Sequence, residues 1–201
     1  MNTKEKIIYE SLTLFSTKGF NAISVRDIAK AVGIKASSLY NHFKNKQDIF
    51  DTIIGKYSAH INNFFSNMKI ETDSNGITLN NIKWTDDQFF IKSLDIFRFC
   101  LQDEYMVKFR KLLTIERFNN SKIADLYNKL FIEDVLNFQS KIFESLINSN
   151  ILIKKDPYTL AIQFYSPVFL LSYRHDSITD NELTSLKKHI REFKDIYTLK
   201  G

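Results

Sequence analysis

Residues that form tight turns are scarce in this chain, which has five glycines and two prolines among 201 residues. A β-sandwich or barrel needs a turn about every 8–12 residues, and glycine and proline supply many of those turns. The sequence therefore predicts an all-α fold. Apolar residues recur at intervals of three and four, and this period predicts about nine helices.

Three short helices are predicted in the first 45 residues, followed by a longer helix over residues 46–68. Apolar periodicity predicts the remaining helices at 85–102, 104–118, 121–148, 157–173 and 180–197. Thr85 with Gln88 and Thr179 with Glu182 have the spacing of capping boxes, which mark helix starts. We expect two domains, a small one at 1–45 and a larger helical one at 46–201, with helix 46–68 linking them.

The net charge of +5 is concentrated at the start of the chain. Residues 1–60 contain nine Lys or Arg against five Asp or Glu, whereas residues 61–201 contain 19 against 18. A basic module joined to a nearly neutral one suggests a polyanionic partner such as nucleic acid. A solvated basic face without a partner explains the charge equally well.

The second and third predicted helices have the pattern of a helix-turn-helix. Ala29 in the second helix permits a close helix crossing, and Gly33 turns the chain. Leu39 in the third helix then packs against the second helix. This spacing suits a unit that presents one helix to the major groove of DNA. Any tight helix pair favours small and apolar residues at these positions, so the flanking residues are needed to narrow the interpretation.

The stretch GFNAISVRDIAKAVGIKASSLYNHFKNKQDIF resembles the TetR family of bacterial transcription regulators. The resemblance rests on residues in and around the helix-turn-helix: Gly19-Phe20, Ser24, Arg26 to Ala29, Gly33, Leu39-Tyr40-Asn41-His42-Phe43 and Lys46. It implies a helical regulator that binds a palindromic operator as a homodimer, most often a repressor released by a small molecule. Beyond residue 60 it implies only a larger helical ligand-binding and dimerisation domain.

Residue chemistry divides the expected DNA contacts into two groups. Lys46, Tyr40 and the helix start at Ser24 suit phosphate oxygens, which position a protein on DNA. Arg26 suits guanine and Asn41 suits adenine, so these two side chains would read bases. For Arg26 a salt bridge to a neighbouring acid is the alternative, and for His42 packing within the module. The remaining predicted contacts are residues of the third helix and its start: Lys35, Ala36, Ser37 and Ser38.

Aromatic side chains are abundant, with 18 Phe, 9 Tyr and one Trp. Some of this apolar surface is expected to line a pocket for a small apolar or aromatic effector in the larger domain, although ordinary core packing explains most of it. The predicted walls are Phe90, Leu94, Phe97, Phe109, Phe131, Phe138, Phe164 and Phe169. The polar groups expected to orient a ligand are Arg98, Glu116, Tyr127 and Gln163.

Apolar residues in the last predicted helix are spaced 3, 4, 3, 4, which is typical of a packing seam. They are Leu183, Leu186, Ile190, Phe193 and Tyr197. Together with helix 157–173, this seam could form a four-helix bundle across a two-fold axis. An intramolecular stripe is the alternative, because the seam spans only two heptads.

Other functional classes are disfavoured by the sequence. One cysteine, Cys100, excludes an internal disulfide, and the four histidines lack the spacing of zinc ligands. No catalytic constellation or cofactor motif is present, and no segment has the apolar length of a membrane span. We therefore expect a cytoplasmic protein without metal, cofactor or enzymatic activity. The alternatives are a DNA-binding or partner-binding regulator without an effector and a helical carrier of apolar molecules.

Overall fold

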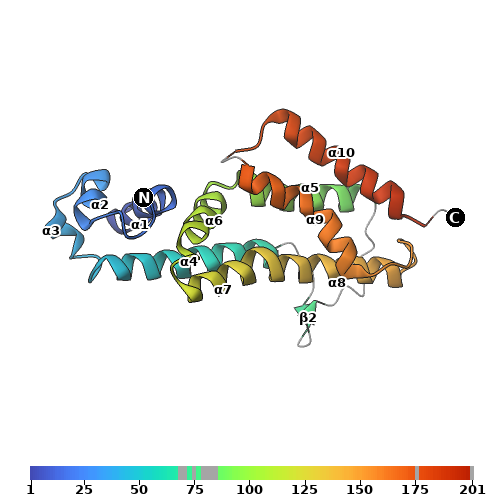
Figure 1. The fold of residues 1–201 in the computed structure, drawn as a ribbon, viewed down its shortest axis with the longest axis horizontal. Helices are drawn as coiled ribbons and strands as arrows, with labels where there is room; N and C mark the ends of the chain where they lie inside the picture. The colour runs from blue at the N-terminus through green and yellow to red at the C-terminus, as the bar shows by residue number, and fades with distance from the viewer. Residues whose placement is uncertain (68–71, 74–75, 78–85, 175–176, 200–201) are drawn as a thin grey trace. The chain divides into compact units, whose positions relative to one another are not determined.

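The computed structural model describes residues 1–67, 72–73, 76–77, 86–174 and 177–199. Helices make up nearly all of this part of the chain, which confirms the all-α prediction (Figure 1). The helices are α1 (Thr3–Lys18), α2 (Val25–Val32), α3 (Ala36–Leu39), α4 (Lys46–Asn67), α5 (Asp86–Gln102), α6 (Glu104–Glu116), α7 (Ser121–Asn128), α8 (Asp134–Asn148), α9 (Pro157–Arg174) and α10 (Asp180–Tyr197).

The predicted helix 121–148 is divided in the structure. A π-helical turn, η1 (Lys129–Glu133), separates α7 from α8. Between α4 and α5, the described residues include a short antiparallel pair, β1 (Thr72–Asp73) with β2 (Gly76–Ile77). The capping residue predicted at Thr85 lies outside the described residues, whereas Thr179 caps α10 as predicted.

Local signals place the first helices. Asn2 caps α1, because its side chain accepts a hydrogen bond from the N–H of Glu5. The third helix is very short, since α3 ends at Leu39. After it, the N–H groups of Asn41 and His42 donate to carbonyls three residues back, which makes a tighter turn than an α-helix.

Contacts within the chain define two compact units. The first unit comprises Met1–Asn63 and Glu104–Leu130, and the second comprises Phe64–Asp103 and Phe131–Gly201. These units are defined by packing and not by function. The boundary between a DNA-binding and a ligand-binding domain that we expect after residue 45 therefore remains a prediction. No helix in the described part of the chain combines the length and apolar character needed to cross a membrane.

In the first unit, α1 packs against both α2 and α6. The interior is built from fully buried apolar side chains on α1, α2, α3, α4 and α6: Ile7, Leu12, Phe15, Ile28, Leu39, Ile49, Ile53, Phe109, Leu112 and Leu113. Because this core includes residues from α6, the helix-turn-helix is supported by a segment about 70 residues further along the chain.

In the second unit, α9 packs against α5, α8 and α10 (Figure 1). Its interior is aromatic. The ring of Phe164 on α9 lies against Phe97 on α5, Phe143 on α8 and Phe193 on α10, with centroid separations of 5.2, 5.5 and 4.8 Å. Much of the aromatic surplus noted in the sequence is therefore core.

Candidate nucleic-acid interface

The start of α2 is held by a reciprocal cap. The N–H of Asp27 donates to Ser24 Oγ at 3.2 Å, while Asp27 Oδ2 accepts from the Ser24 hydroxyl and N–H at 2.6 and 2.8 Å. These hydrogen bonds, from the hydroxyl first and the N–H second, hold the pKa of Asp27 below its ordinary value. The N–H groups of Val25 and Arg26, in the first turn, have no acceptor within the helix and can face a phosphate.

Gly33 makes the turn between α2 and α3. Its φ of 79° and ψ of 32° lie in the left-handed region, which glycine adopts with little strain. The N–H groups of Gly33 and Ile34 both donate to the carbonyl of Ala29 at 3.0 Å, which closes α2. Ala29 and Leu39 are buried, as the helix-turn-helix pattern requires.

The outer side of this motif is polar and accessible. Arg26 is exposed, and within the described residues it makes no ion pair, so the structure does not show the salt bridge that was its alternative role. Tyr40 is 56% exposed, which is unusual for an aromatic side chain. Five other predicted contacts are also exposed: Ser24, Lys35, Ser37, Asn41 and His42. Ala36 and Ser38 are half-buried.

Lys46 differs from the other predicted contacts, because it is already engaged. Its Nζ donates to the carbonyls of Phe20 and Ile23, both at 2.8 Å, and lies 4.1 Å from the centre of the Phe20 ring. An ammonium group has three donors, so one remains for a ligand. The structure therefore shows a bracing role for Lys46, which the sequence did not predict.

The model of the bacterial regulatory proteins of the TetR family matches residues 7–53. This match covers the helix-turn-helix module and confirms the predicted resemblance to the TetR family. The biofilm operon negative transcriptional regulator IcaR of Staphylococcus aureus strain Newman is 43% identical over 60 residues, which are 30% of this chain and 32% of the relative. The corresponding regulator of Staphylococcus epidermidis is 30% identical over 120 residues, 60% of this chain and 58% of the relative. The matches thus span less than two thirds of these relatives.

Solved structures of TetR-family and other transcriptional regulators share the fold over nearly the whole chain. A TetR-family transcriptional regulator from Mesorhizobium loti has a TM-score of 0.69 at 16% identity, covering 98% of this chain and 97% of that one. A transcriptional regulator from Saccharomonospora viridis, solved with choline, has a TM-score of 0.67 at 16% identity, with 98% of both chains covered. At such identities the likeness concerns the fold alone.

Outside the TetR-family module, the residues predicted to line a pocket belong to both units. Phe109, Glu116 and Tyr127 are buried in the first unit. The other nine belong to the second unit, where Leu94, Phe97, Phe131, Phe138 and Phe164 are buried, Phe90 and Phe169 are half-buried, and Arg98 and Gln163 are exposed. Gln163 Oε1 accepts a hydrogen bond from the Tyr197 hydroxyl at 2.7 Å, which joins α9 to α10.

Gln139 on α8 is a buried polar residue of the second unit that was not predicted. It is 3% exposed, and its Oε1 has no hydrogen-bond partner among the described residues. It precedes Phe143 by four residues, so both side chains lie on the same buried face of the helix. A polar residue at a core position of an apolar stripe is the sequence signal that could have identified it.

The predicted interface residues of α10 divide into two classes. Leu186, Ile190 and Phe193 are buried within one protomer, which is the intramolecular arrangement that the sequence left open. Leu183 and Tyr197 are half-buried. The large exposed apolar residues of α9 and α10 are different ones: Tyr158, Ile162, Leu170, Tyr173 and Ile196.

Proposed function

We propose that this chain is a sequence-specific DNA-binding transcription regulator that binds a palindromic operator as a homodimer in the cytoplasm, without enzymatic activity. The observation that carries the proposal is the accessible polar side of the α2–α3 motif. There the side chains of Arg26, Tyr40 and Asn41 are exposed and have no hydrogen-bond or ion-pair partner among the described residues. Side chains held ready in this way on a helix-turn-helix suit contact with a duplex.

The expected DNA contacts keep their two roles in this proposal. The first-turn N–H groups of α2, the Tyr40 hydroxyl and the remaining donor of Lys46 bind phosphates. Arg26 and Asn41 read bases in the major groove, and the α3 residues Ala36, Ser37 and Ser38 make smaller contacts there. Lys35 and His42 lie just before and just after α3 in the sequence. Lys35 adds a positive charge to this surface, and His42 adds a hydrogen-bonding group.

Repression is the favoured sign of regulation, because the similar staphylococcal proteins are named negative transcriptional regulators. We propose an apolar or aromatic effector that binds in the second unit and lowers operator affinity. Its aromatic interior and the unpartnered amide of Gln139 support this class of ligand. A ligand with one N–H or O–H group could satisfy that amide while its apolar part contacts rings.

The dimer interface is proposed on α9 and the adjacent surface of α10. On α9, Ile162, Leu170 and Tyr173 are 45%, 68% and 47% exposed in one protomer, and their spacings of eight and three residues keep them on one side of the helix. An apolar stripe on a helix surface needs a covering partner, and a second copy supplies one with two-fold symmetry. This location replaces Leu186, Ile190 and Phe193, which are already covered within their own protomer.

Selection of bound duplexes from random-sequence DNA tests the DNA-binding role. Enrichment of a palindrome with half-sites about one helical turn apart, or a multiple of it, is expected. Arg26→Ala should then cost about 1–3 kcal/mol and relax discrimination at one position of each half-site, whereas Lys46→Ala should weaken all sequences alike. Absence of any enriched sequence would reject the proposal.

A further inference from the structure

The peptide groups around Phe20, in the connection between α1 and α2, are held from two sides. The N–H of Phe20 donates to Oε1 of Glu116, the last residue of α6, at 2.7 Å. Its carbonyl accepts a hydrogen bond from Lys46, the first residue of α4, at 2.8 Å. One residue of backbone therefore joins the end of α6 to the start of α4.

The glycine before Phe20 permits this close approach. A Cβ at Gly19 would lie 3.1 Å from Glu116 Oε1 and 3.1 Å from Cγ2 of Ile115, closer than most real contacts of a Cβ. Gly19 also has a φ of 79°, a conformation that strains other residues. Both facts favour glycine at this position. Because glycine has no Cβ, the Glu116 carboxylate can approach the Phe20 peptide closely.

The side chain of Phe20 strengthens the same junction. Its ring packs edge-on against Phe50 and Phe15, with centroid separations of 4.9 and 5.4 Å, and Lys46 Nζ lies over it at 4.1 Å. Lys46 is thus located by two carbonyls and one aromatic face. Movement of Phe20 would change two of these contacts at once, the hydrogen bond to its carbonyl and the contact with its ring.

Burial of the Glu116 carboxylate is not explained by stability alone. It is 8% exposed, and among the described residues it has no ion pair. A buried carboxylate without a cationic partner is destabilising relative to an apolar side chain of similar size. Its carboxylate instead accepts the hydrogen bond from the N–H of Phe20, which partly offsets the cost of burial.

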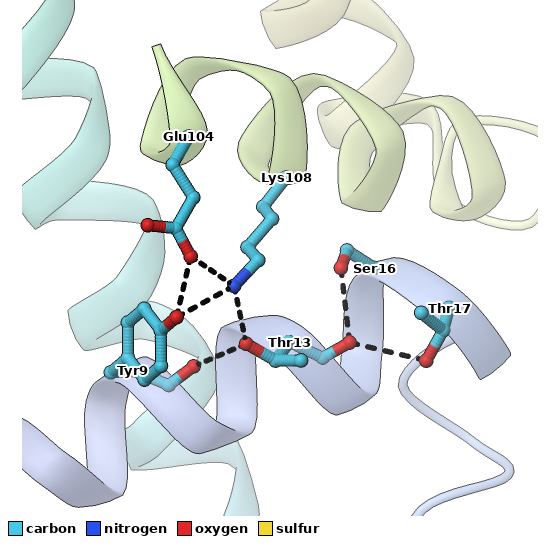
Figure 2. Close-up of polar contacts among 6 residues, drawn as sticks. All are labelled: Tyr9, Thr13, Ser16, Thr17, Glu104 and Lys108. Atoms are coloured by element: carbon cyan, nitrogen blue, oxygen red, sulfur yellow. Dashed lines mark hydrogen bonds and ion pairs between the residues drawn. The ribbon is translucent and has the colours of Figure 1, made fainter. Parts of the chain in front are cut away.

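At the other end of α6, a second polar cluster fastens this helix to α1 (Figure 2). Lys108 Nζ donates to Glu104 Oε1 at 2.6 Å, to Thr13 Oγ1 at 2.9 Å and to the Tyr9 hydroxyl at 3.1 Å. The Tyr9 hydroxyl in turn donates to Glu104. This cluster joins α6 to α1 without touching Phe20 or Lys46, so it provides a matched comparison.

We propose that Glu116 is a positioning residue for DNA binding. By accepting the Phe20 N–H, it fixes the backbone that holds the Lys46 ammonium at the start of α4, where its remaining donor reaches a phosphate. A displacement of α6 then alters a phosphate contact through the connection between α1 and α2. This inference rests on the proposed DNA-binding function.

The test uses the whole chain described above and a duplex that the wild-type protein selects from random-sequence DNA. Glu116→Leu removes the acceptor but suits the buried site, and it should weaken binding about tenfold. It should also reduce the slope of log affinity against log salt concentration by the equivalent of about one phosphate contact per half-site. Lys46→Ala should have the same effect. Glu116→Gln keeps an acceptor oxygen and should restore both values.

A double-mutant cycle separates positioning from general stability. The combined Glu116→Leu/Lys46→Ala protein should bind no more weakly than Lys46→Ala alone, because both changes remove the same contact. Glu104→Gln, at the other end of α6, should leave the salt dependence unchanged. Circular dichroism and thermal unfolding confirm that each variant is folded at the assay temperature.

Three results would overturn the inference. Additive losses in the double-mutant protein would show that Glu116 and Lys46 act independently. An unchanged salt dependence in Glu116→Leu, or an equal change in Glu104→Gln, would assign Glu116 a role in folding alone. Failure of the wild-type protein to select any duplex would reject DNA binding itself, which is a different outcome from either of these.

Discussion

The ring of Phe193 on α10 packs edge-on against the ring of Phe164 on α9, with 4.8 Å between their centroids. Phe193 also lies 5.3 Å from Phe143 on α8 and is 5% exposed. Phe193, which the sequence placed in a possible dimer seam, therefore packs in the core of its own protomer.

Phe193→Ala should accordingly destabilise the fold by about 3–5 kcal/mol, the usual cost of a cavity left by a buried phenylalanine. Urea unfolding followed by circular dichroism measures this change. Lys188→Ala on the same helix is the control, because its exposed ion pair with Glu192 contributes about 1 kcal/mol or less. A stable Phe193→Ala monomer would instead place this residue at a subunit interface.

Dimerisation should depend on the exposed face of α9. Leu170→Asp puts a charge at a position that is 68% exposed in one protomer, so it should leave the helical content unchanged while dissociating the dimer. Sedimentation at a series of protein concentrations measures the effect. Phe118→Asp, at an equally exposed site in the first unit, should leave the dimer intact. A Leu170→Asp protein that remains dimeric would move the interface away from this face.

The cluster in Figure 2 should add a pH-dependent contribution to stability. Hydrogen bonds from Lys108 first and Tyr9 second hold the pKa of Glu104 below its ordinary value of 4.5. A carboxylate with a lowered pKa stabilises the fold above its unfolded pKa, and this stabilisation is lost as the pH falls through the folded value. Burial lowers the pKa of Lys108, but hydrogen bonds to Glu104 and Tyr9 outweigh burial and raise it.

Glu104→Gln should therefore lower the free energy of unfolding at pH 7, and the difference from wild type should vanish in acid. The loss should stay below about 1 kcal/mol, since Glu104 is 55% exposed and solvent screens the pair. Chemical unfolding at pH 7 and at about pH 3, which is below the ordinary pKa of a glutamate, checks the sign. Glu133→Gln, an exposed carboxylate outside the cluster, is the control. A difference that grows in acid would contradict this assignment.

Removing the unpartnered amide of Gln139 should stabilise the protein. Gln139→Met preserves the shape of the side chain and removes a buried group without a hydrogen bond, so the free energy of unfolding should rise by about 1–3 kcal/mol. Gln102→Met, at an exposed position, should change it by about 0.5 kcal/mol or less. A loss of stability in Gln139→Met would show that a bound water or ligand satisfies the amide in solution.

The sequence by itself determined the features of this protein that depend on neighbouring residues. The Ser24–Asp27 and Thr179–Glu182 caps lie at the predicted helix starts, and Gly33 adopts the left-handed conformation that its position between two short helices indicates. Such hydrogen bonds and dihedral angles involve groups within a few residues of one another. The all-α fold and the helix-turn-helix could therefore be predicted.

Only the tertiary structure decided which surfaces each helix presents to its own chain. A period of three and four places Phe193 on a stripe, but the same period describes an intramolecular core and a dimer seam. The contact of Glu116 with Phe20 joins residues 96 positions apart, and the buried Oε1 of Gln139 has no hydrogen-bond partner within the described part of the chain. These relationships depend on how distant helices pack, which local periodicity does not specify.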